Sequence, residues 1–294
     1  MKRHRRIYSA LAVMLFLLVF IASCSQGSEK GKIIRAFSNQ MELKSYTMNG
    51  NMELSQEHDN TVNRDFKIGV SFEGKYNKEP YYQVIDMNYD IMGLGMDVKI
   101  YTKDHEVWIK APMYPEYLHI DTYEHMKKQD RNTENQNIFD ERDRHKMEME
   151  FFEILDEDKY SLASNKEKAD LDVIAVDITN EDAQDLIKSF GELFVANLIP
   201  GVKMDFEETQ NIFEIEELVV EIGINKKFVK YEEYSGILKL KDNNIENEHQ
   251  KMKFNIIIEY DDFNKKLDFN FPDFEGKDII NYNELFGIPM NKME

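Results

Sequence analysis

Cysteine is almost absent from this sequence of 294 residues, because Cys24 is the only one. No disulfide can form within the chain, and residues 25 to 294 offer neither a thiolate metal ligand nor a cysteine nucleophile. The sequence also lacks a glycine-rich phosphate loop, an H-E-x-x-H motif and a G-x-S-x-G motif. It therefore carries no signature of the P-loop enzymes, the zinc peptidases or the α/β hydrolases. The stability of the fold must come from burial alone, and no cofactor is predicted.

Positive charge is scarce as well. The chain has 37 Lys and Arg against 56 Asp and Glu, for a net charge of −19. Residues 1 to 23 hold four of the basic residues and no acidic one, so the rest of the chain carries a net charge of −23. Phosphate backbones repel such a surface, and nucleic acid is excluded as a partner. Anionic lipid head groups would also repel it, so surface charge cannot hold the chain at a membrane.

The N-terminus has the layout of a secretory signal. Lys2, Arg3, Arg5 and Arg6 precede an apolar run from Ala10 to Ala22, which ends at small residues. This run of 13 residues is shorter than the about 20 that a transmembrane helix needs. The sequence Ile21-Ala22-Ser23-Cys24 resembles the bacterial lipobox. The resemblance implies that Cys24 receives a diacylglyceryl group and becomes the first mature residue, whereas an ordinary cleaved signal with an incidental cysteine is the alternative.

These features predict three regions. Residues 1 to 23 are expected to be a lipoprotein signal peptide and residues 24 to 31 a lipidated flexible tether, since the latter stretch is polar with two glycines. Residues 32 to 294 are expected to form a single domain. The predicted location is the extracytoplasmic face of the cell membrane, where two acyl chains give a stable anchor.

Alternation of apolar and polar residues dominates the domain and predicts strands. In 46 to 54, for example, Tyr46, Met48, Met52 and Leu54 alternate with polar residues. Further strands are expected at 66–76, 81–89, 94–100, 107–109, 171–178, 218–224, 228–240 with a bulge near Glu232-Glu233, 252–260 and 267–271. Helices are expected at 32–44, in one or two pieces within the charged segment 124–160, and at 181–198.

A sheet of nine to eleven strands with its apolar residues on one face must curve around other elements that cover this face. The predicted fold class is therefore α+β and mainly β, a curved antiparallel sheet or half-barrel with helices over its concave face. The helix at 181–198 is expected to fill the concave side of the sheet. This order of elements, with paired phrases such as Val98-Lys99-Ile100-Tyr101 and Val107-Trp108-Ile109-Lys110, resembles the LolA-like and LppX-like bacterial lipoproteins over most of residues 32 to 286. The resemblance implies a cavity for acyl chains between sheet and helices; the long charged segment 124–160 departs from the family pattern and could be a lid or an interaction surface.

Candidate site residues are apolar and adaptable, since methionine fits irregular guests. The residues expected to line a ligand cavity are Met48, Met52, Phe72, Met87, Met96, Phe190, Phe194 and Phe254. An ordinary filled core is the alternative interpretation of the same stripes. The histidines at 58, 105, 119, 125, 145 and 249 are scattered and are expected at the surface, so no metal site is predicted. Acidic clusters such as Asp140-Glu141-Arg142-Asp143 and Asp156-Glu157-Asp158 lack the rhythm of a calcium loop and are expected to be solvated helix faces.

Two functional hypotheses follow. The first is a non-catalytic, membrane-anchored lipoprotein that binds or shuttles a hydrophobic ligand, such as a lipid, in the concavity of the half-barrel. The second is an envelope interaction protein that docks a protein partner through its acidic surface and the 124–160 segment. An enzyme ranks third, because no nucleophile or acid–base pair stands out.

Overall fold

Twelve strands form one continuous sheet in the computed structural model. The structure describes residues 27–57, 67–112, 114, 116–121, 141–163, 168, 170–179, 181–183, 213–240, 251–274 and 279–281. The order across the sheet is β12-β6-β5-β4-β3-β2-β1-β11-β10-β9-β8-β7, and only the β12–β6 pair is parallel. Because the two ends do not pair, the sheet is open. The strands are β1 (Ser45–Glu57), β2 (Lys67–Asn77), β3 (Tyr82–Ile91), β4 (Leu94–Lys103), β5 (Glu106–Lys110), β6 (Tyr117–Asp121), β7 (Tyr160–Leu162), β8 (Asp172–Asp177), β9 (Phe213–Asn225), β10 (Phe228–Leu240), β11 (Lys251–Asp261) and β12 (Ile279–Asn281).

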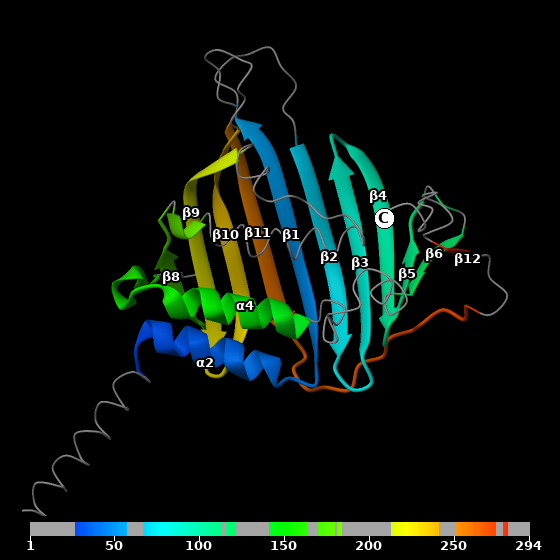
Figure 1. Cartoon of the computed structure of the whole chain (residues 1–294), viewed down its shortest axis with the longest axis horizontal. Helices are drawn as coiled ribbons and strands as arrows, with labels where there is room; N and C mark the ends of the chain where they lie inside the picture. Colours follow the sequence, from blue (N-terminus) through cyan, green and yellow to red (C-terminus); the bar gives the residue numbers. More distant parts are fainter. Residues whose placement is uncertain are drawn as a thin grey trace, which may run out of the picture.

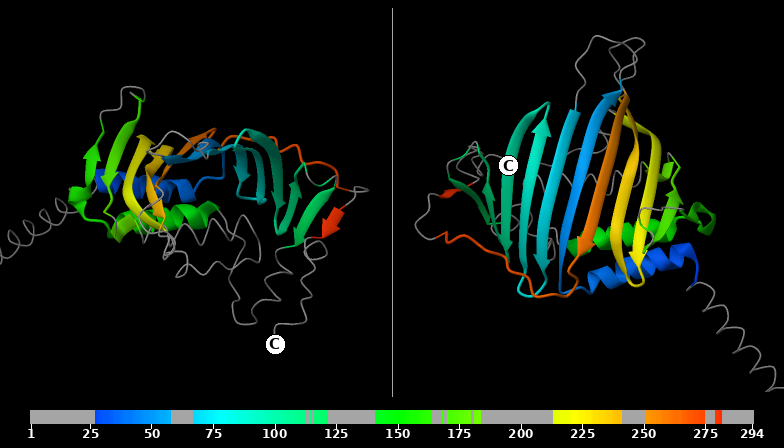
Figure 2. Two further views of the ribbon diagram at one scale, coloured as in Figure 1. Left: turned by 90° about the horizontal axis from the view of Figure 1, so that it is seen from above. Right: turned by 180° about the vertical axis from the view of Figure 1, so that it is seen from behind.

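Two helices lie on one face of this sheet, which we call the inner face. Figure 1 shows α2 (Glu29–Met41) and α4 (Glu141–Ile154) crossing the lower part of the sheet, and in Figure 2 the β5–β6–β12 edge bends towards the same side. α2 packs against α4 and against β7, β9 and β10. The predicted fold class, a curved antiparallel half-barrel with helices on its concave face, is confirmed.

The main core lies between these helices and the sheet. Ile33, Ala36 and Phe37 of α2 and Phe152 of α4 meet buried strand residues such as Ile222. Both helices therefore bury one apolar stripe each against the strands, as an amphipathic helix must. None of the described helices is long and apolar enough to cross a membrane.

The first helix begins earlier than the sequence pattern predicts. Ser28 caps α2 because its Oγ accepts a hydrogen bond from the N–H of Gly31, which satisfies one of the free amides of the first turn. The helix then runs from Glu29 to Met41 instead of 32 to 44. The last three residues of the predicted tether, 29 to 31, are thus helical.

The charged middle of the chain contains a helix, α4, as predicted for 124–160. Residues 122 to 140 lie outside the described part. Of the helix predicted at 181–198, residues 181 to 183 are helical, and the rest lies outside the described residues. Among the described residues the inner face is covered by α2 and α4, so the predicted role of 181–198 as filler stays a prediction.

Several strand predictions need correction. The short strands β6, β7 and β12 were not predicted, because three to five residues give too little alternation to recognise. The strand predicted at 267–271 does not form. β11, which precedes it, already has β1 and β10 as neighbours, so no edge is free for a returning strand. The bulge predicted near Glu232-Glu233 is also misplaced, since β10 shifts register between Val229 and Tyr231 and between Ile237 and Leu238.

The segment that follows β11 lies against the other face, which we call the outer face. Phe269 and Phe271 place their rings 5.8 and 5.3 Å from the ring of Tyr82, and Phe274 stacks on Trp108 at 4.3 Å. A shallow groove of about 410 Å³ lies beside them, lined by Tyr82, Lys103, Trp108, Phe271, Pro272, Asp273 and Phe274. The alternation of Phe269 and Phe271 therefore reflects ring packing on the outer face, and not a strand.

Candidate functional site

Apolar side chains from five neighbouring strands stand in register on the inner face. Gly50 of β1 lies opposite Phe72 of β2, which lies opposite Met87 of β3. Since side chains alternate between the faces of a strand, residues that pair directly share a face. We call the set the apolar inner face; it comprises Met48, Gly50, Met52 and Leu54 of β1, Ile68, Val70 and Phe72 of β2, Ile85, Met87, Tyr89 and Ile91 of β3, Leu94, Met96, Val98 and Ile100 of β4, and Phe254, Ile256 and Ile258 of β11.

Six of the eight predicted ligand-lining residues belong to this set. Met48, Met52, Phe72, Met87, Met96 and Phe254 all lie on the inner face. Phe190 and Phe194 lie outside the described residues, as does Cys24, the predicted lipidation site. The six thus share one face of the sheet, and the cavity they were expected to line stays a prediction.

Burial along the apolar inner face changes from one end to the other. Below α2 and α4, Tyr46, Met48, Tyr76 and Tyr260 are buried within the main core. Further along the strands, Met52, Phe72, Met87, Met96 and Phe254 are only partly buried. At the far end, Leu94 is 77% exposed. The filled-core interpretation thus describes the helix-covered end, while the middle and far end keep apolar surface available for contact.

Gly50 matters to the packing of this face. A Cβ atom at residue 50 would lie 2.6 Å from Cζ of Phe72, so the ring of Phe72 occupies the space directly over the glycine. The same Cβ atom would lie 2.3 Å from the backbone oxygen of Ile257, so only glycine fits beside Phe72 at this position.

Away from the aromatic residues that the segment after β11 covers, such as Tyr82, the outer face of the same strands is polar, as the alternation predicts. Ser71, Glu73 and Asn88 are exposed, and Lys99 forms a hydrogen-bonded ion pair with Asp86 at 2.9 Å. Each strand therefore has one solvent-exposed polar face and one apolar face. Solvent-exposed ion pairs of this kind contribute at most about 1 kcal/mol to the stability of the fold. They indicate that this face is in contact with solvent.

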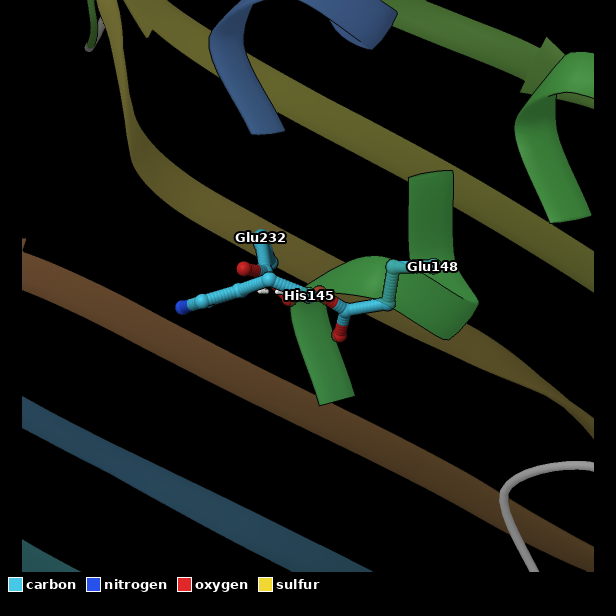
Figure 3. Close-up of side chains that lie close together, drawn as sticks. All are labelled: His145, Glu148 and Glu232. Carbon is cyan, nitrogen blue, oxygen red and sulfur yellow. Dashed lines mark hydrogen bonds and ion pairs between the residues drawn. The ribbon is translucent and has the colours of Figure 1, made fainter. Parts of the chain in front are cut away.

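A buried polar cluster interrupts the core beneath α4. Figure 3 shows His145 and Glu148 of α4 next to Glu232 of β10. All three side chains are buried, with His145 only 1% exposed. Nδ1 of His145 lies 3.1 Å from a carboxylate oxygen of Glu148, which places the two on one side of the helix at a spacing of three residues.

Arg144 joins the two carboxylates of this cluster. Its guanidinium donates to Glu148 and, at 3.3 Å, to Glu232, and it also donates to the hydroxyl of Tyr260 on β11. The hydroxyl of Tyr234 donates to Glu232 at 3.1 Å. We call Arg144, His145, Glu148, Glu232, Tyr234 and Tyr260 the buried polar cluster. It fastens α4 to β10 and β11 at the covered end of the apolar inner face.

Burial and like charge set the ionisation of this cluster. Desolvation raises the pKa of Glu232 to about 7, and the negative charge of Glu148 adds to the rise. Arg144 and His145 act in the opposite direction and lower it. Burial also raises the pKa of Tyr234 well above its usual value, so its hydroxyl stays a neutral donor. The cluster thus holds two carboxyl groups close together with one permanent positive charge.

The prediction that the histidines lie at the surface is wrong for His145. It was missed because the residues around it, such as Arg144 and Lys146, are charged and predict a solvated helix. A signal was nevertheless present, since His145 and Glu148 fall on the same helix face as the buried Phe152. Glu232 was missed because the sequence Tyr231-Glu232-Glu233-Tyr234 suggests a bulge. By contrast, Asp156-Glu157-Asp158 is exposed, as predicted for the acidic clusters.

Comparisons with known proteins give matches to solved structures at low sequence identity. No protein-family model matches the chain, and the search of curated proteins finds no match. A solved LolA superfamily protein from Nitrosomonas europaea is 9% identical, with 83% of this chain and 95% of that chain covered and a TM-score of 0.21. A solved DUF1329 family protein from Desulfovibrio piger is 8% identical, with 81% and 94% covered and a TM-score of 0.24. The first of these two proteins belongs to the superfamily that the sequence resembles. Because both TM-scores are low, the description of the fold as an open curved sheet depends on the strand pairing observed in this chain.

Proposed function

We propose that the chain is a non-catalytic carrier that binds a hydrophobic ligand, such as the acyl chain of a lipid, against the apolar inner face. The proposal includes export and attachment to the outer side of the cell membrane through lipid on Cys24. The observation that supports it most is the run of in-register apolar side chains that stays partly exposed beyond α2 and α4.

The chemistry of this face suits a flexible guest. Met52 of β1 and Met96 of β4 lie on one row across the sheet, and Met87 of β3 lies two residues from that row. Methionine adapts its shape to what it touches. Each CH₂ group of an acyl chain that leaves water contributes about 0.8 kcal/mol. An acyl chain lying across these strands would therefore bind without any charged contact. The acidic outer surface takes no part in this binding.

A charge on the apolar inner face should weaken ligand binding. Phe72→Glu places a carboxylate among the methionines, and we expect at least a tenfold loss of affinity, or about 1.4 kcal/mol, because the charge must lose water when the ligand covers it. The measurement is titration of residues 25 to 294, which include every described residue, with a fluorescent 16-carbon fatty acid.

The matched control is Ser71→Glu, one residue earlier on the outer face. It adds the same charge to the same strand and should leave the affinity unchanged. Equal losses in the two variants would contradict the proposed face. A chain that binds no fatty acid and no extracted membrane lipid would refute the carrier function and favour the protein-docking hypothesis.

The membrane anchor has its own test. When the bacterium that expresses the full chain grows with labelled palmitate, the chain should become labelled, because the lipid-transferring reaction needs the thiol of Cys24. The variant Cys24→Ser should carry no label and should leave the membrane fraction. Label that persists in Cys24→Ser would contradict the anchor without touching the ligand-binding result.

A further inference from the structure

Three side chains with metal-binding atoms meet between α4 and β10. His145 and Glu148 come from one face of α4 and Glu232 from the facing strand, as Figure 3 shows. One donor atom from each lies within 4.8 Å of the others, and all three residues are buried. Among the described residues this is the one group of three or more such side chains with that spacing.

The oxygens of the two carboxylates are not equally satisfied. Glu148 uses one oxygen for Arg144 and the other faces Nδ1 of His145 at 3.1 Å. Glu232 receives both Arg144 and Tyr234 on Oε2. Its Oε1 is buried and has no hydrogen-bond partner in the described part of the chain. A buried carboxylate oxygen without a donor is costly, and a bound cation is one way to satisfy it.

We propose that His145, Glu148 and Glu232 bind a divalent transition-metal ion that ties α4 to β10. This inference goes beyond the carrier function, since it concerns how the helix is held on the sheet. Tetrahedral ligands with bonds of about 2.0 Å lie roughly 3.3 Å from one another. The 3.1 Å between Nδ1 of His145 and the oxygen of Glu148 is close to that spacing.

Arg144 fits such a site. It holds one oxygen of each carboxylate, and Tyr234 holds the same oxygen of Glu232. Carboxylates that bind metal ions commonly accept such outer hydrogen bonds, which orient them and are needed for full affinity. The guanidinium also balances part of the charge of the two buried carboxylates. Its Nη2 lies 3.4 Å from Nδ1 of His145, so an ion bound to that nitrogen would replace this contact while the bonds from Arg144 to the carboxylates stay.

The donor set selects the class of ion. One imidazole nitrogen and two carboxylate oxygens suit Zn²⁺, Fe²⁺ or Mn²⁺, whereas Ca²⁺ requires six to eight oxygens. Three protein ligands leave a fourth position for water or another donor. Because two ligands come from the helix and one from the strand, the ion would add a direct bond between α4 and the sheet.

The test uses the full chain, stripped of metal with a chelator and titrated with ZnCl₂ alone. We expect one Zn²⁺ per chain with micromolar or tighter affinity. At a free Zn²⁺ concentration about 100 times the Kd, the Tm should rise by about 5–10 °C. Co²⁺ in place of Zn²⁺ should give a visible absorption band of a four- or five-coordinate ion with nitrogen and oxygen ligands.

Ligand variants and a matched histidine control locate the site. His145→Gln and Glu232→Gln should each lose at least 100-fold in affinity. His119→Gln should bind as tightly as the unchanged chain, because within the described part of the chain His119 pairs with one carboxylate, that of Glu106, at a half-buried position. No bound Zn²⁺, or affinity unchanged in His145→Gln, would overturn the proposal. If the ligand variants do not fold, the Tm shift and the Co²⁺ band of the unchanged chain decide, and the absence of both overturns it.

Discussion

Replacing Arg144 by methionine should lower the free energy of unfolding by about 3–5 kcal/mol. The guanidinium is the permanent positive charge between Glu148 and Glu232, and both carboxylates are fully buried. Without it, one carboxylate must either stay ionised and unpaired in the core or take up a proton. Because Arg144 lowers the pKa of Glu232, its loss would raise that pKa further and leave Glu232 protonated at neutral pH. Protonation limits the cost but cannot restore the lost hydrogen bonds.

The measurement is urea unfolding in the presence of a chelator, so that no metal ion contributes. Lys146→Met is the matched control on the same helix, since Lys146 and Glu150 are mostly exposed and 3.7 Å apart. An exposed pair at this spacing contributes about 0.3–0.5 kcal/mol. If Arg144→Met were no more harmful than Lys146→Met, the cluster would not be buried as described.

A compensated variant separates charge from packing. Arg144→Met combined with Glu148→Leu and Glu232→Leu removes the arginine and both carboxylates. It keeps His145, which is neutral without a carboxylate beside it, and leaves an otherwise apolar contact between α4 and β10. Apolar replacement of a buried ion network is often neutral or stabilising. We therefore expect the triple variant to recover most of the stability that Arg144→Met loses. A triple variant less stable than Arg144→Met would mean that the shape of the cluster matters more than its charge.

Most strands could be predicted because each long strand has one solvent-exposed face, which gives its sequence an alternation of polar and apolar residues. Alternation in 46 to 54 correctly predicts β1, and the same rule predicts β2 to β4 and β9 to β11 within a few residues. Alternation fails where a ring packs on a face without pairing, as Phe269 and Phe271 do against Tyr82. It also fails for β12, whose three residues pair with a strand far away in the sequence.

The apolar part of the candidate site was predictable for the same reason, and the polar part was not. The apolar inner face follows from alternation alone, since residues that share a parity share a face. The buried polar cluster depends on contacts such as that between Arg144 and Glu232, which are 88 residues apart. A charged residue predicts exposure unless its partner is known. Local pattern holds no information about that partner, so His145 and Glu232 were assigned to the wrong environments.

Truncating Phe152 to alanine should destabilise the protein by about 3–5 kcal/mol, the range for a buried phenylalanine. Phe152 is 0% exposed and stacks on Phe37 of α2, with ring centroids 5.6 Å apart. It also makes an edge contact with Phe151 at 5.3 Å. The truncation would therefore leave a cavity between the two helices and the sheet, in the part of the core that closes the covered end of the apolar inner face.

The size of the loss depends on how far the neighbours can collapse into the space. In the Phe152→Ala variant α4 is still held in place, because the buried polar cluster fixes it to β10 and β11. The helix cannot move into the space without breaking those contacts, so the upper part of the range is expected. Ile154→Ala, two residues along the same helix at a position 72% exposed, should cost less than about 0.5 kcal/mol in the same urea unfolding experiment. Equal losses for Phe152→Ala and Ile154→Ala would contradict the packing of α4 on α2, and with it the closed end that the carrier proposal places beside the ligand.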